Sequence, residues 1–118
     1  MRNTTLIAAL LAIMLFVVSV AFAEQDKNLL SFNISPNPMD KLCTISVVLD
    51  SPMFVTLQVQ TLKGTVIRDL YSGDTFKEIN VQWDRNDNTG SYVPTGKYIV
   101  ALDYNTRYTS TKKTLILK

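Results

Sequence analysis

Three groups of residues in this sequence have side chains suited to catalysis or binding. Asp84 and Asp87 form a close acidic pair in a polar stretch, and paired carboxylates can exchange protons with a substrate. Cys43 is the only cysteine, and a lone thiol can react or bridge two chains. Lys112–Lys113 and Lys118 form a basic C-terminal group, which we consider as a recognition element.

The residue types needed for common catalytic sites are missing. The sequence contains no histidine, which excludes Ser-His, Cys-His and histidine-metal sites. Its four glycines stand singly, so no phosphate-binding loop is present. We interpret Asp84 and Asp87 as residues that cap a loop. The sequence therefore predicts a protein that is not an enzyme and binds no cofactor.

Calcium is the one metal ion for which the sequence offers candidate ligands. Asp84, Asn86, Asp87 and Asn88 place hard oxygen ligands on a single loop, and calcium prefers such ligands. An EF-hand register fails, because Thr89 stands where that loop requires glycine. These residues are weak calcium candidates, and a hydrogen-bonded turn is the favoured interpretation.

The N-terminus has the pattern of a cleavable export signal. Arg2 precedes an apolar run from Leu6 to Val20, and Ala21–Ala23 then supplies a small-x-small cleavage site before Glu24. A transmembrane anchor is the alternative, since the run is long enough to span a bilayer. The immediate change to polar residues favours cleavage. We predict a signal peptide over residues 1–23, membrane contact only through it, and export to the periplasm, cell surface or medium.

The remaining chain suits one small domain. Removing 23 residues from 118 leaves 95, a length that matches a single domain with a modest core. The 12 basic residues include Arg2, so 11 basic and 10 acidic residues remain, a net charge of +1. This is too little charge for a nucleic-acid partner.

Apolar residues after the signal alternate with polar ones, the pattern of half-buried strands. The predicted inward-facing residues are Leu30, Phe32 and Ile34; Cys43, Ile45, Val47 and Leu49; Val55, Leu57 and Val59; Ile67; Ile79, Val81 and Trp83; Tyr98, Val100, Leu102 and Tyr104; Leu115 and Leu117. About seven short strands predict an all-β, antiparallel immunoglobulin-like sandwich. A small barrel would give the same periodicity. Cys43 and Trp83 are predicted to be core residues because both share an inward phase.

Turn residues separate the predicted strands. Ser35–Pro38 contains two prolines, which end the first strand or confine it to a sheet edge. Ser72–Asp74 predicts a turn after a short strand over 65–71. Asp84 can accept backbone N–H bonds in the loop after Trp83, and Gly90 can adopt the positive φ that closes it.

An ordered set of short motifs accompanies these strands. The motifs are Ser35-Pro36-Asn37-Pro38, Thr44-Ile45-Ser46, Val55-Thr56-Leu57-Gln58-Val59, Leu62-Lys63-Gly64, Val81-Gln82-Trp83-Asp84, Pro94-Thr95-Gly96-Lys97-Tyr98 and Lys113-Thr114-Leu115-Ile116-Leu117-Lys118. Together they resemble the C-terminal sorting domain of type IX secretion cargo, and equally the immunoglobulin-like domain of flagellar hook-capping proteins. The export signal argues against a hook cap.

The resemblance implies a seven-stranded sandwich that is recognised by an outer-membrane translocon. Two features depart from it. The family usually has glycine after Trp-Asp, where this chain has Arg85, so a different turn is expected there. Sorting domains also follow a cargo domain, whereas only a short segment over 24–30 precedes the predicted domain over 31–118. The chain is therefore expected to act alone or to be a remnant of a larger protein.

Two functional hypotheses follow. The first is an exported sorting or surface-interaction module whose protein partner is secretion machinery and whose recognition residues are Lys112, Lys113 and Lys118. The second is a free-standing periplasmic or extracellular structural protein with no sorting role; the sequence leaves the oligomeric state open. In both, the residues expected to maintain the scaffold are Trp83, Asp84, Gly90, Pro94, Gly96 and Tyr98.

Overall fold

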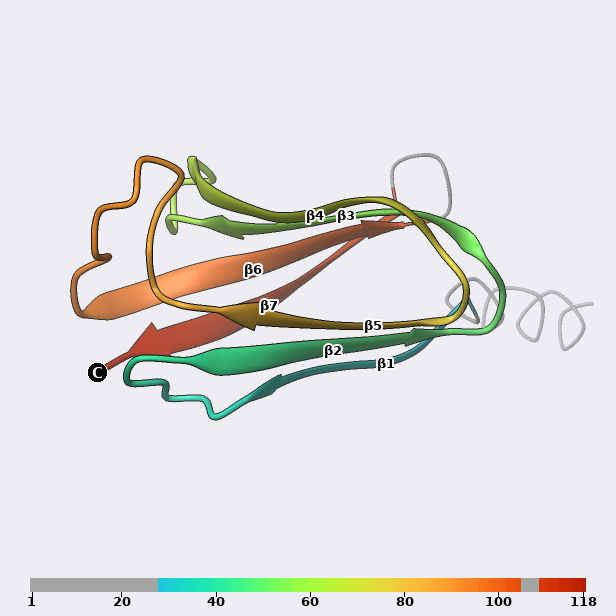
Figure 1. The fold of residues 1–118 in the computed structure, drawn as a ribbon, viewed down its shortest axis with the longest axis horizontal. Helices are drawn as coiled ribbons and strands as arrows, with labels where there is room; N and C mark the ends of the chain where they lie inside the picture. Colours follow the sequence, from blue (N-terminus) through green and yellow to red (C-terminus); the bar gives the residue numbers. More distant parts are fainter. Residues whose placement is uncertain (1–27, 105–108) are drawn as a thin grey trace, which may run out of the picture.

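The computed structural model describes residues 28–104 and 109–118 as a chain of seven β-strands (Figure 1). The strands are β1 (Leu29–Ser35), β2 (Cys43–Leu49), β3 (Met53–Gln60), β4 (Val66–Thr75), β5 (Glu78–Trp83), β6 (Gly96–Tyr104) and β7 (Thr109–Leu117). No helix long and apolar enough to cross a membrane occurs in these residues. The predicted signal peptide lies outside the described residues.

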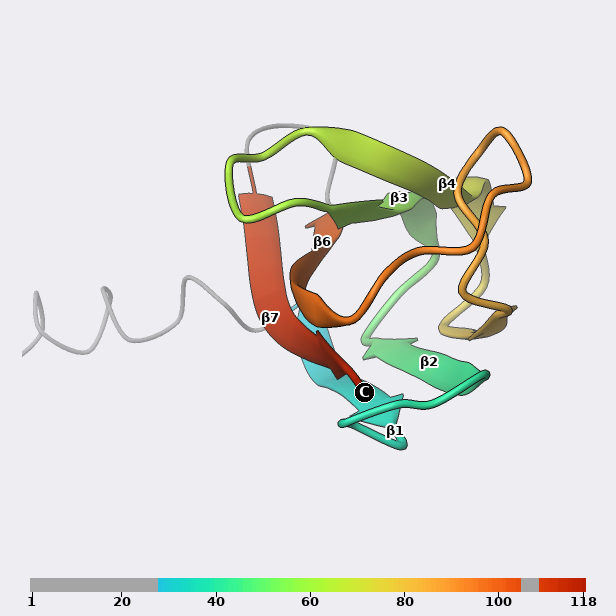
Figure 2. The ribbon, with the colours of Figure 1, turned by 90° about the vertical axis from the view of Figure 1, so that its left-hand side faces the viewer.

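The strands form two facing sheets. The smaller sheet has the order β1-β2-β5, and the larger has the order β4-β3-β6-β7. Every pair of neighbouring strands is antiparallel. Figure 2 shows the two layers end-on, with β4 and β7 on opposite sides of the larger sheet. The predicted all-β sandwich is confirmed.

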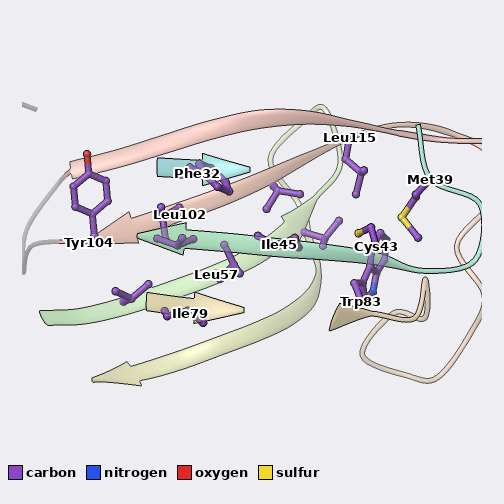
Figure 3. Packing of buried hydrophobic residues seen from close by; sticks show 14 of the residues in the cluster. Phe32, Met39, Cys43, Ile45, Leu57, Ile79, Trp83, Leu102, Tyr104 and Leu115 are labelled. Atoms are coloured by element: carbon purple, nitrogen blue, oxygen red, sulfur yellow. The ribbon is translucent and has the colours of Figure 1, made fainter. Parts of the chain in front are cut away.

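The inward-facing residues of both sheets make one core (Figure 3). Burial alternates strictly from Cys43 to Leu49 in β2 and from Val55 to Gln60 in β3, where every second residue is buried and those between are half-buried. Trp83 is 0% exposed and pairs with Cys43 on the neighbouring strand, which is 1% exposed. The predicted core positions of both are confirmed. Burying each large apolar side chain stabilises the fold by about 1.5–3 kcal/mol.

The burial of Cys43 makes a testable prediction about alkaline pH. Burial raises the pKa of its thiol from 9.0 to about 11, against a smaller opposing effect of a hydrogen bond from the Trp83 backbone. The neutral thiol is thus favoured in the folded chain, and its stabilising effect is complete below pH 9 and is lost as pH rises towards 11.

We expect the wild type to lose about 1 kcal/mol more unfolding free energy than Cys43→Ala between pH 7 and pH 10. Urea unfolding of both proteins at the two pH values measures this difference. The two proteins differ only at position 43, so the difference between their losses reports on the thiol. Identical losses would show that the folded thiol ionises as easily as the unfolded one.

Two predicted strand details are wrong. Leu30 was expected to face inward, but it is 63% exposed because the pairing of β1 with β2 shifts register between Leu29 and Ser31. The turn expected at Ser72–Asp74 is instead part of β4, where these residues pair with β3. The backbone pairing of these residues with Phe54–Thr56 of β3 outweighs the local preference of glycine and aspartate for turns.

The proline segment after β1 behaves as predicted. β1 ends at Ser35 and is an edge strand of the smaller sheet. The chain then passes through Pro36 and Pro38 and crosses to the larger sheet, where Met39 forms a parallel bridge with Leu117. Met39 is completely buried, so this crossing also closes one end of the core.

Candidate functional site

The candidate recognition lysines lie along β7 in two different settings. Leu115 and Leu117 face the core, so Lys112 and Lys118 face outward, and both are exposed. Lys113 shares the inward phase of the two leucines, and its Nζ lies 5.5 Å from the ring centroid of Phe32 on β1. Lys113 therefore covers the flank of the core between the two sheets, whereas Lys112 and Lys118 are directed to solvent.

The outer edge of β7 is partly covered by the segment that follows β1. The Asn37 side chain donates from Nδ2 to the Thr114 carbonyl at 2.9 Å and accepts from the Ile116 N–H at 3.0 Å. Met39 then donates its N–H to the Ile116 carbonyl at 2.8 Å and accepts from the Lys118 N–H at 2.9 Å. We call this set of four bonds the Asn37 clamp. Through these bonds the end of β7 is also hydrogen-bonded on the side that faces away from β6.

A similar arrangement covers part of β4 at the opposite edge of the same sheet. Asn88 donates its N–H to the Ile67 carbonyl at 2.9 Å, and its Oδ1 accepts from the Asp69 N–H at 2.9 Å. Its Nδ2 also donates to the Asp69 carboxylate at 3.1 Å. An asparagine thus substitutes for a strand at both edges of the larger sheet. Covered edges resist unwanted pairing with other chains.

The polar loop between β5 and β6 is held by its own carboxylates. The Asn86 N–H donates to Asp84 Oδ1 at 3.1 Å. Asp87 Oδ1 accepts from the Thr89 hydroxyl at 2.6 Å and from the backbone N–H groups of Thr89 and Ser91, both at 2.9 Å. The backbone bond from Asn86 holds the pKa of Asp84 below 3.8, and the side-chain bond from Thr89 does the same for the pKa of Asp87.

These bonds leave the four calcium candidates without a shared centre. Asp84 and Asp87 bind separate backbone groups, and the Asn88 side chain is bound to β4. The carbonyls of Asn86 and Asp87 accept from the Arg68 guanidinium at 3.3 and 3.2 Å, which places a cation beside the loop. No cluster of three acidic, histidine or cysteine side chains occurs in residues 28–104 and 109–118. The geometry is that of a hydrogen-bonded turn.

Arg85 is the residue of this loop whose role sequence reasoning missed. Its backbone takes a φ of 65°, the left-handed conformation that favours glycine. Arg85 thus has a backbone conformation that glycine would adopt without strain. The sequence signal was present, because an arginine at a glycine position has to be stabilised by contacts of its side chain.

Those contacts bury the guanidinium. Arg85 is 2% exposed. Its Nε donates to the Val93 carbonyl at 2.9 Å, its Nη1 donates to the Asp40 carbonyl at 2.7 Å, and Tyr92 stacks on it with 4.7 Å to the ring centroid. Arg85 thereby joins the β5–β6 loop to the segment after β1, and both lie at the same end of the sandwich in Figure 1.

The predicted scaffold residues surround this junction. Trp83 donates its indole N–H to the Asn86 carbonyl at 2.9 Å, and the Tyr98 hydroxyl donates to the Pro94 carbonyl at 2.8 Å. Gly90 has a φ of 89°, the positive value that was predicted. Gly96 begins β6. The polar loop bonds to β4 and the lysines lie on β7, at opposite edges of the sheet, so these groups do not form one site.

The fold has counterparts among solved structures. Latent dimeric PorU from Porphyromonas gingivalis matches 73% of this chain at 18% identity, with a TM-score of 0.61. PorZ, described as an essential surface component of the type IX secretion system of the same organism, matches 75% at 18% identity, with a TM-score of 0.49. This chain spans 9% and 11% of those two proteins. No protein-family model and no curated protein matches the sequence. The chain thus shares its fold with a small part of PorU.

Proposed function

We propose that this protein is an exported, non-catalytic immunoglobulin-like module that is recognised through β7 by secretion or surface machinery. The observation that supports it most is the position of Lys112 and Lys118. Lys112 is exposed on the outer face of β7, an edge strand of the larger sheet, and Lys118 is exposed directly after the strand. The ordered motifs that resemble type IX sorting domains, and the shared fold with part of PorU, favour the same function.

The absence of catalysis is part of the proposal. The chain has no histidine, and one oxygen of each carboxylate in its close acidic pair is engaged in ordering the β5–β6 loop. A general acid needs a raised pKa to donate a proton near neutral pH. The pKa values of Asp84 and Asp87 are shifted in the opposite direction.

The lysines can be tested without disturbing the fold. In the native host, Lys112→Glu with Lys118→Glu is expected to move the protein from the surface or medium to the periplasm. The matched control is Lys63→Glu with Lys77→Glu, which changes the same charge at two exposed positions outside β7. Both double variants are expected to keep their stability within about 0.5 kcal/mol, since exposed substitutions rarely cost more.

Cell fractionation with mass spectrometry of each compartment gives the result. The same spectra report whether the chain begins at Glu24, which tests signal cleavage separately. Equal distribution of the β7 variant, the control and the wild type would contradict recognition through Lys112 and Lys118.

Self-association is the alternative function, and edge pairing is its simplest route. The Asn37 clamp covers the end of β7, and Asn88 covers the start of β4. These contacts shorten the free edges of the larger sheet through which copies could pair. Sedimentation of the exported protein over a range of concentrations distinguishes the two functions, since a structural assembly protein should form stable oligomers.

A further inference from the structure

The part of β7 that the Asn37 clamp leaves uncovered has a definite orientation. The outward-directed backbone groups of the covered half belong to Thr114, Ile116 and Lys118. Backbone orientation alternates with a period of two along an antiparallel strand. The N–H and C=O groups of Ser110 and Lys112, with the Thr114 N–H, therefore point to the same outer side.

Within residues 28–104 and 109–118, no strand pairs with these groups. β6 lies on the other side of β7, and the bridge to Met39 is confined to the other half of the strand. Among the described residues, no hydrogen bond occupies the outward groups of Ser110 and Lys112. We call Ser110–Thr114 the open edge. An unpaired strand edge is a template to which another extended chain can add.

The charge beside the open edge determines which kind of partner segment it favours. Lys112 is exposed and lies opposite Ala101 on β6, which contributes no charge. The one acidic side chain of β6 is Asp103, which is opposite Ser110 and whose carboxylate accepts from the Thr56 hydroxyl. The Lys112 side chain is exposed, so its ammonium group is available to a carboxylate on an incoming strand.

We propose that the open edge is a docking site for a short, acidic, extended segment of a partner protein, which adds to the larger sheet as a fifth strand. The backbone of the segment would pair with Ser110, Lys112 and Thr114, and a carboxylate would meet Lys112. The Asn37 clamp limits the length of this pairing to about five residues, because it already occupies the Thr114 carbonyl. This inference rests on the proposed recognition through β7 and names the chemistry of the partner.

A peptide that alternates glutamate and valine over seven residues is a suitable probe. It is titrated into the ¹⁵N-labelled protein that a bacterial host exports from the full chain. We expect amide shifts at Lys112 and Thr114 and slower hydrogen exchange of both amides. A peptide with alternate backbone nitrogens methylated should not bind, because it cannot form the ladder. Lys112→Glu should weaken binding about fivefold, while Lys77→Glu should not.

Several results would overturn the inference. Equal binding of the methylated peptide would mean charge attraction without strand addition. Shifts confined to β1 or β5 would place the docking site on the smaller sheet. Protection of the Lys112 amide that grows with protein concentration alone would assign the edge to a second copy of the chain. Absence of binding at about 1 mM peptide, a free energy weaker than about −4 kcal/mol, would also reject it.

Asn37→Ala provides an independent check on the length limit. Removing the side chain frees the Thr114 carbonyl and the Ile116 N–H, so a nine-residue peptide should gain affinity over the seven-residue peptide only in this variant. The proposed function is judged separately, by the cellular distribution of the lysine variants. If those variants mislocalise while the peptides fail to bind, β7 is recognised by another route.

Discussion

Deleting Thr114–Lys118 is expected to unfold the sandwich as well as to remove a recognition tail. The deletion takes away Leu115 and Leu117, which are 0% and 1% exposed in the core. Truncating one buried leucine costs about 2–5 kcal/mol, so both cost about 4–10 kcal/mol. The whole folding free energy of a small domain is about 5–15 kcal/mol. The same deletion also removes every β7 partner of the Asn37 clamp.

Urea unfolding and limited proteolysis of the exported protein measure this effect. We expect the deleted chain to lose its cooperative transition and to be degraded within the domain, whereas Lys118→Ala should unfold like the wild type. A cooperative transition in the deleted chain would show that β7 contributes little to the core. Loss of localisation on this deletion therefore does not identify a sorting signal, and the charge-reversing lysine variants are the better test.

The second large effect is expected at Arg85. Arg85→Ala removes charged donors from the carbonyls of Val93 and Asp40 and leaves these partly buried acceptors to find other partners. The tie between the β5–β6 loop and the segment after β1 is lost with them. An unsatisfied buried acceptor costs about 1–3 kcal/mol. We expect the unfolding free energy to fall by about 2–4 kcal/mol, measured by urea unfolding at pH 7.

Arg85→Gly separates the side chain from the backbone. Glycine adopts a φ of 65° without the steric cost that alanine incurs, which is about 1 kcal/mol or slightly more. The expected order of stability is therefore wild type, then Arg85→Gly, then Arg85→Ala. If alanine proved more stable than glycine, the left-handed backbone at this position would be wrong. If both variants matched the wild type, the buried guanidinium would have no net stabilising role.

Period-two alternation was enough to predict the strands and most of the core. In β2, β3 and β5 the inward residues, from Cys43 to Trp83, follow the sequence pattern without interruption. The prediction failed where pairing alters the phase. The register shift in β1 turns Leu30 outward, and β4 continues through Ser72–Asp74 because β3 offers it partners. The orientation of Leu30 and the length of β4 both depend on pairing with a neighbouring strand and not on local composition.

The candidate site was harder to predict because its interactions join distant positions. Asn37 was read as part of a proline-flanked strand end, yet its side chain bonds with Thr114 and Ile116, 77 and 79 residues away. Asn88 was read as a calcium candidate, and the structure places it against β4. An exposed asparagine has the same appearance in a sequence whether it binds a metal ion, a strand or water.

The long sequence separation of the Asn37 clamp also has a consequence for the timing of folding. A chain that emerges from the ribosome or from a membrane channel with its N-terminus first exposes Asn37 and Met39 early. Their partners Thr114 and Ile116 lie 77 and 79 residues after Asn37 and emerge much later. Contacts between distant positions form slowly because a long loop has to close. The domain thus completes its core only after residues 114–118 have emerged, and the closing of the sandwich is delayed until then.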